Sequence, residues 1–110
     1  MRKLDLRNYD VEVMNEKGEF EKKSYNFKGS LIELLFVKTL NLDSMELLSH
    51  DSLAKKIMQC KDDSLLIEEA EYQMLTRSIQ AVRGFGRHEV GLVNRIMNET
   101  KTVEVAEAKE

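Results

Sequence analysis

The stretch from Leu65 to Met97 places the tightest constraint on how this chain folds. Its apolar residues recur at steps of three and four positions in two segments, first Tyr72, Leu75, Ile79 and Val82, then Val90, Val93, Ile96 and Met97. This spacing brings side chains onto one face of a helix. Between the segments lies Arg83-Gly84-Phe85-Gly86-Arg87-His88, whose glycines are typical of a sharp turn. We therefore predict a helix, a turn and a second helix, with the glycines ending the first helix.

Residues 4–27 predict a β-hairpin. Apolar and charged residues alternate in 4–6 and again in 9–13, but the two runs differ in parity. The strand register must therefore shift by one near Asn8, through a bulge or a short turn. The polar run 15–18 ends in glycine and predicts the hairpin turn. Because a two-stranded hairpin is only marginally stable alone, we expect its apolar face to pack on helices. The residues expected to point inward from the returning strand are Phe20, Tyr25 and Phe27.

Two capping-box sequences predict the starts of the next helices. In Ser30-Leu31-Ile32-Glu33 and in Asp43-Ser44-Met45-Glu46, the first side chain and the glutamate can satisfy each other's backbone amides. Gly29 is the expected break before the first helix. That helix is apolar on almost every side, which predicts a buried central element. The polar run 49–52 leaves two alternatives open, one long helix or two short ones.

These segments together predict an α+β fold, in which the N-terminal hairpin packs against four to five helices. The apolar run 65–67 fits either a short strand or a first helical turn, and we favour a strand. The acidic pair Glu68-Glu69 follows it, as is typical of a helix start. A weak alternation predicts another short strand at 102–105, which would offer an edge for pairing with another chain. We expect one domain over 1–105 and a frayed acidic tail at 106–110.

Composition argues against several classes of function. The chain has 17 basic and 20 acidic residues, a net charge of -3 and interspersed signs, so it lacks the clustered cations of a broad nucleic-acid surface. Its single cysteine, Cys60, has no close Cys or His partner, and with His50 and His88 it forms no known metal or catalytic motif. We therefore expect no enzyme activity, no metal and no cofactor. Without a long apolar run or a leader-like segment, we expect a cytoplasmic protein that does not contact membranes.

The glycine-punctuated turn is the best candidate for a partner-binding site. Its glycines would hold out Phe85 beside three basic or titratable groups, a combination suited to an acidic partner. The predicted partner-binding residues are Arg83, Phe85, Arg87 and His88. A structural role explains the same residues and is the stronger interpretation, with the glycines as helix caps, Phe85 in the core and the arginines in solvent.

Nucleic-acid binding is the alternative interpretation of this stretch. A helix-turn-helix would use Arg83, Arg87, Asn94 and Arg95 as its contacts. Its turn, however, is longer than the usual three to four residues, and the second helix offers few side chains that read bases. We therefore favour a protein partner over DNA or RNA.

Four segments carry a resemblance to known proteins. They are D-L-R-N-Y-D-V-E-V at 5–13, K-G-S-L at 28–31, L-L-I-E-E-A-E-Y at 65–72 and G-F-G-x-x-E-V-x-L-V-x-R-I-M at 84–97. In texture and segment order the chain resembles small proteins encoded by bacteriophages and prophages. The resemblance implies a non-enzymatic phage accessory or virion-assembly protein that binds a phage or host protein. It would act in the host cytoplasm or in the virion, and we also expect a homodimer.

Overall fold

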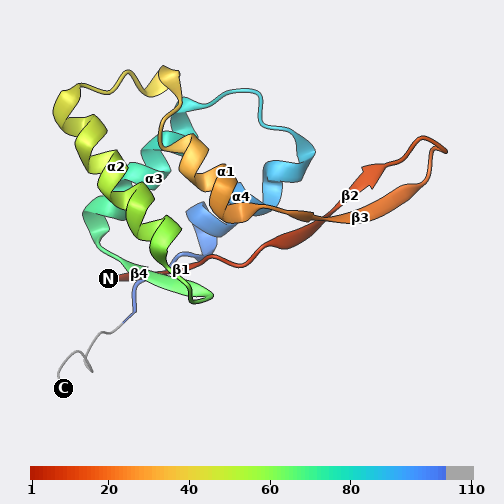
Figure 1. Ribbon diagram of the computed structural model, residues 1–110, viewed down its shortest axis with the longest axis horizontal. Coiled ribbons are helices and arrows are strands. Elements are labelled where there is room, and N and C mark those ends of the chain that lie inside the picture. Colours follow the sequence, from red (N-terminus) through yellow and green to blue (C-terminus); the bar gives the residue numbers. More distant parts are fainter. Residues whose placement is uncertain (104–110) are drawn as a thin grey trace.

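Four helices and two small antiparallel sheets make up the part of the chain that the structure, a computed structural model, describes, residues 1–103 (Figure 1). The predicted α+β class is confirmed. In chain order the main elements are β1 (Arg2–Asp5), β2 (Tyr9–Met14), β3 (Phe20–Tyr25), α1 (Phe27–Leu34), α2 (Ser44–Gln59), β4 (Ser64–Ile67), α3 (Glu69–Ala81) and α4 (Val90–Asn94). Short 3-10 turns lie at Lys38–Leu40 and Arg87–Glu89, and a π-helical turn lies at Arg95–Glu99.

The first sheet joins segments that are far apart in the sequence. β1 pairs antiparallel with β4, from Arg2 opposite Ile67 to Asp5 opposite Ser64. The predicted strand at 65–67 is therefore confirmed. On the other side of β1, the Val103 amide donates to the Met1 carbonyl at 2.9 Å. Thr102 and Val103, the first two residues of the predicted strand at 102–105, thus lie beside β1, where Thr102 forms an isolated bridge with Arg2. Residues 104 and 105 and the predicted tail at 106–110 lie outside the described residues.

The second sheet is the predicted hairpin, formed by β2 and β3. Its register runs from Tyr9 opposite Tyr25 to Met14 opposite Phe20. The shift near Asn8 is where the chain leaves the first sheet and enters the second. Asn8 Oδ1 accepts a hydrogen bond from the Phe27 amide at 3.0 Å, so this crossover is tied to the start of α1.

Most of the hairpin extends away from the helical body (Figure 1). Tyr9 and Tyr25 at its base pack against the core, but Phe20 near its far end is 57% exposed. The expectation that Phe20 points inward is therefore wrong, because the strands reach beyond the helices. Phe27 is fully buried, as expected, although it belongs to α1 and not to a strand.

Helix α1 begins earlier than the capping-box pattern predicts. Asn26 is its N-cap, and the Asn26 side chain accepts a hydrogen bond from the Gly29 amide at 3.1 Å. Gly29 and Ser30 consequently lie inside the helix, and the predicted break at Gly29 is wrong. Two asparagines that the sequence analysis overlooked, Asn8 and Asn26, satisfy the first amides of the helix.

Helix α2 begins at the predicted capping box and continues without interruption to Gln59. The Glu46 amide donates to Asp43 Oδ1 at 2.8 Å, and the Asp43 amide donates to Glu46 Oε1 at 3.1 Å. The polar run 49–52 does not divide the helix, because His50 turns inward. Its buried Nδ1 lies 2.8 Å from the Leu35 carbonyl oxygen.

The two helices predicted in the 65–97 stretch are present, but the end of the first and the buried face of the second differ from the prediction. Helix α3 ends at Ala81, before the glycines, because Val82 is already extended. In and after α4 the buried residues are Leu92 and Ile96, whereas Val90 is 63% exposed. The helical face is rotated from the one predicted, because a 3-10 turn precedes α4 and a π-helical turn follows it.

Candidate site at the base of the projecting arm

Residues 9–25, which we call the arm, meet the glycine turn, residues 83–88, at the edge of the helical body. The Tyr9 hydroxyl donates to the His88 carbonyl oxygen at 2.8 Å. His88 Nε2 lies 2.9 Å from the Glu12 carbonyl oxygen. Since a carbonyl oxygen only accepts, Nε2 is the donating nitrogen of that ring. The glycine turn therefore contacts the arm at two positions along β2, Tyr9 and Glu12.

Tyr9 is the central residue of this joint. Its hydroxyl also accepts a hydrogen bond from the Leu92 amide at 2.9 Å, and its ring stacks on Tyr25 with centroids 4.8 Å apart. Burial raises the pKa of Tyr9 above its ordinary value. A Cβ on Gly91 would lie 2.8 Å from two carbons of the Tyr9 ring, which is closer than atoms tolerate. Only glycine lets α4 approach the tyrosine this closely.

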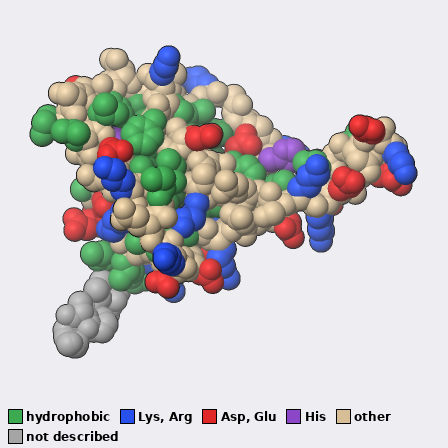
Figure 2. All heavy atoms as spheres, in the orientation of Figure 1, with side chains coloured by type: hydrophobic (Ala, Val, Ile, Leu, Met, Phe, Trp, Pro, Cys, Tyr) green, Lys and Arg blue, Asp and Glu red, His purple; other side chains and the backbone are tan. Residues whose placement is uncertain are grey.

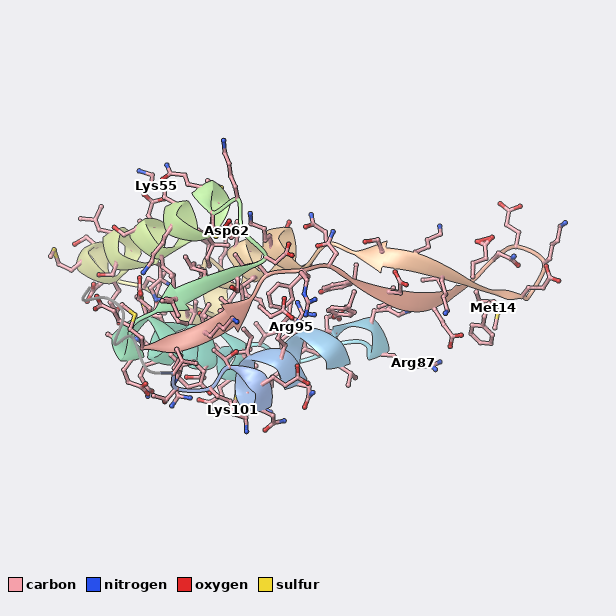
Figure 3. All side chains as sticks on the ribbon, turned by 90° about the horizontal axis from the view of Figure 1, so that it is seen from below. Met14, Lys55, Asp62, Arg87, Arg95 and Lys101 are labelled. Carbon is pink, nitrogen blue, oxygen red and sulfur yellow. The ribbon has the colours of Figure 1, made fainter. Side chains whose placement is uncertain are left out.

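Arg95 also contacts this joint, near the base of the arm (Figure 3). Its guanidinium carbon lies 4.3 Å from the centroid of the Phe27 ring and 5.3 Å from that of Tyr9. The guanidinium also donates to the carbonyl oxygens of Asp5 and Arg7. Arg95 therefore holds the crossover between the two sheets against the start of α1.

Of the four predicted nucleic-acid contacts, two are held by other residues of the chain and two are exposed. Arg95 is engaged within the chain, and Asn94 donates to Glu99 Oε2 at 2.7 Å while its own side-chain oxygen accepts from Asn98. Arg83 and Arg87 are exposed. In the described part of the chain neither forms a salt bridge, so these two arginines are the ones left to meet a partner.

Phe85 lies between the two roles that the sequence suggested for it. The ring is partly buried and packs against the core. It also lines a groove of about 420 Å³ between α1, the glycine turn and α4, whose other apolar walls are Tyr25, Leu34, Val37, Val82 and Leu92. Gly84 has a φ of +89°, a backbone conformation that favours glycine. The four predicted partner-binding residues therefore split, with Phe85 and His88 turned inward and the two arginines outward.

The arm has two different faces, which the alternation along β2 separates. The inner face, turned toward the body at its base, carries Tyr9, Val11 and Val13 opposite Tyr25, Lys23 and Glu21. The outer face carries Asp10, Glu12 and Met14 opposite Ser24, Lys22 and Phe20, and all six are exposed. Met14 is 63% and Phe20 is 57% exposed. Figure 3 shows Met14 at the far end of the arm and Arg87 near its base.

The outer face was not among the predicted sites. A turn at 15–18 does fix which residues of the two strands lie opposite each other, so the pairs on this face could be predicted from the sequence. The expectation of a packed hairpin concealed it, since packing would have left this face as ordinary polar surface.

A second exposed apolar surface lies on α2, away from the arm. Met45 is 71% and Leu48 is 62% exposed, and they share a helix face. In Figure 2, hydrophobic side chains gather on the side of the body opposite the arm, whereas charged side chains crowd the end of the arm.

The structure does not bring His50, Cys60 and His88 together. His50 and Cys60 lie ten positions apart along and just beyond α2, a rise of about 15 Å. Cys60 Sγ is 3.5 Å from the Ser64 carbonyl oxygen, while His88 lies at the arm. Within residues 1–103, no group of three or more His, Cys, Asp or Glu side chains is placed to hold a metal ion.

Comparison with family models, with curated proteins and with solved structures found no match to this chain. Over the described residues, no helix has both the length and the apolar character that crossing a membrane requires. The feature of the fold that stands out as a candidate site is the arm, together with the exposed arginines of the glycine turn at its base.

Proposed function

We propose that this protein acts by binding another protein, as a small phage accessory or virion-assembly protein in the host cytoplasm or the virion. The observation that carries the proposal is the arm. A two-stranded hairpin is marginally stable by itself, and this one buries little beyond its base. On its inner face, Val11 and Val13 lie beyond the core and are only partly covered. A partly exposed apolar strip on a projection is suited to a partner's surface.

The joint at the base supports this use, because it holds the arm in one direction. Tyr9 and His88 link β2 to the glycine turn, and Arg95 links the crossover to α1. A contact surface that is already ordered loses less conformational entropy on binding.

The inner face of the arm is where we place the partner. Beside this face, along the edge of β2, lies a hollow of about 280 Å³. It is lined by residues 9–12 of the strand and by Arg87, His88 and Gly91. Val13, next along this face, is half-buried. An apolar strip beside an exposed arginine suits a partner segment that carries apolar and acidic side chains.

Charge favours a protein over a nucleic acid as the partner. Between residues 10 and 24 the arm carries five carboxylates and three lysines. Affinity for DNA or RNA comes largely from clustered cations that neutralise phosphates. Two of the four residues proposed as nucleic-acid contacts, Asn94 and Arg95, are held in contacts within the chain. Arg83 and Arg87 are the observation that keeps nucleic-acid binding as the second candidate.

Photo-crosslinking in the cells that naturally produce the protein tests the proposal. A benzophenone amino acid replaces Val13 on the inner face, Arg87 in the glycine turn, or Lys55 on α2 as the control. Lys55 is exposed, and among the described residues its one salt bridge is the i, i+4 pair with Asp51. We expect adducts with a different protein from positions 13 and 87 and none from position 55.

Equal adducts from all three positions, or none from 13 and 87, would contradict the proposal. Retardation of DNA or RNA in gels at low salt, weakening as salt rises, would favour the nucleic-acid alternative. That effect should then be lost when Arg83 and Arg87 are both replaced by alanine.

A further inference from the structure

The outer face of the arm consists of three rows of directly opposite residues, and each row contains two unlike groups. Asp10 lies opposite Ser24, Glu12 lies opposite Lys22, and Met14 lies opposite Phe20. All six side chains are exposed. Moving outward from the base, the rows are thus a carboxylate with a hydroxyl, a carboxylate with an ammonium, and a thioether with an aromatic ring.

This pattern is complementary to itself. We infer that a second copy of this chain stacks its arm on the outer face, about a two-fold axis that runs along the arm. Such an axis exchanges β2 and β3 but leaves each row at the same distance from the base. Glu12 of one copy then faces Lys22 of its partner, and Met14 faces Phe20. Both contacts occur twice, as a closed two-fold interface requires.

The charges of Glu12 and Lys22 favour arms that stack in the same direction over arms that stack in opposite directions. If the arms stacked in opposite directions, the middle row would place Glu12 over Glu12 and Lys22 over Lys22, which repel each other. Pairing along the free edge of β3 is also disfavoured, because Lys22 and Lys23 lie on that edge and lysines there oppose strand addition. Stacking with the tips together joins unlike charges and covers both apolar side chains.

The position of the body is compatible with this contact. Tyr9 joins the inner face to α4, so the outer face is turned away from that helix. The glycine turn meets β2 at its edge, where His88 Nε2 lies 2.9 Å from the Glu12 carbonyl oxygen. The inner face also stays accessible in the dimer. The inference rests on the proposed function, in that it makes the arm a shared element with one face for a second copy and the other for the partner.

The dimer should be weak. Three rows of two residues form a contact well below the roughly 1,200 Å² of total buried surface found in stable complexes. We expect a dissociation constant on the order of 0.1 mM, so that the dimer forms at high concentration and dissociates on dilution.

Charge exchange followed by sedimentation equilibrium tests the inference. Glu12→Lys alone and Lys22→Glu alone each place like charges in the middle row, and each should weaken association at least tenfold. An equal mixture of the two variants should dimerise again, because every lysine then faces a glutamate of the other chain. The double variant Glu12→Lys/Lys22→Glu should associate as the unmodified protein does.

The control is Lys23→Glu, which changes the net charge equally but lies on the inner face opposite Val11. It should leave the dissociation constant unchanged. The mixture is decisive because each chain in it keeps like charges within its own hairpin, so regained association can only come from contact between chains.

Failure of the double variant to associate would overturn the inference, as would equal losses in Lys22→Glu and Lys23→Glu. An unmodified protein that stays monomeric near 1 mM would also overturn it. In that last case, crosslinks from position 13 to a different protein would still support the proposed function, so the two failures are distinguishable.

Discussion

Replacing Gly91 with alanine tests the joint between the arm and the body, because two effects of opposite sign compete there. Within a helix, alanine is favoured over glycine by about 0.8–1 kcal/mol. A Cβ at this position, however, would lie 2.8 Å from two carbons of the Tyr9 ring and 3.2 Å from its hydroxyl oxygen. Since ordinary contacts of this kind begin near 3.4 Å, the ring must move by several tenths of an ångström.

The cost of that movement follows from what the tyrosine holds. Its hydroxyl donates to the His88 carbonyl and accepts from the Leu92 amide, and its ring stacks on Tyr25. Weakening hydrogen bonds of partly buried groups costs roughly 1–3 kcal/mol. After the helix propensity of alanine is subtracted, we expect Gly91→Ala to lower the free energy of unfolding by up to about 2 kcal/mol.

Urea unfolding followed by circular dichroism measures this change, and Tyr9→Ala supplies the matched background. Without the ring there is no clash, so Gly91→Ala should then stabilise the protein by up to about 1 kcal/mol. The sign of one substitution therefore reverses with its neighbour. A stabilising Gly91→Ala in the unmodified protein, or the same loss in both backgrounds, would refute the described contact.

Three further substitutions test other contacts. Arg95→Lys should lower the free energy of unfolding by about 1–2 kcal/mol, because an ammonium lacks the flat guanidinium that lies over the Phe27 ring while donating to the Asp5 and Arg7 carbonyl oxygens; an unchanged urea midpoint would contradict that role. Arg7 holds the pKa of Asp5 below its ordinary 3.8, so this carboxylate stabilises the fold above that pH and the contribution is lost as pH falls through the lowered pKa. Asp5→Asn should therefore flatten the loss of stability below about pH 4, and an equally steep acid titration would argue against the pair. Phe85→Ser should lower stability by roughly 1–3 kcal/mol because the ring packs on the core, whereas unchanged stability with lost partner binding would make it a contact residue only.

Local signals in the sequence predicted those parts of the fold that short segments determine. The prediction of a capping box at Asp43 is confirmed, because both of its partners lie within one helical turn. The change of parity near Asn8 correctly located a break, although the pattern could not show that the break separates two sheets. The pairing of β1 with β4 could not be predicted, because no local feature of either strand indicates which distant segment it pairs with.

The arm shows why burial was harder to predict than secondary structure. Val11 and Val13 alternate with charged residues just as they would in a strand packed on a helix. Whether such a strand is covered depends on how far the helices extend beneath it, which is a property of the whole fold. The predicted inward position of Phe20 failed for this reason.

The candidate site was found only in part for a related reason. Arg87 and His88 were identified from the glycine turn, and the structure places them beside the arm. Arg95 looked like a base-reading arginine because a cation on a short helix is usually in solvent. Only the tertiary structure places it over Phe27.

The position of β1 has a consequence for how the chain folds as it is synthesised. This strand is synthesised before the other described elements, yet Arg2 pairs with Ile67 on one side and with Thr102 on the other. The arm, whose two strands are neighbours in the sequence, can form within microseconds of its own synthesis. The core sheet can close only when nearly all of the described chain has emerged, since distant pairings make folding slow. While the residues between β1 and its partners are synthesised, β1 therefore has unsatisfied edges, and during this interval the nascent chain is exposed to aggregation.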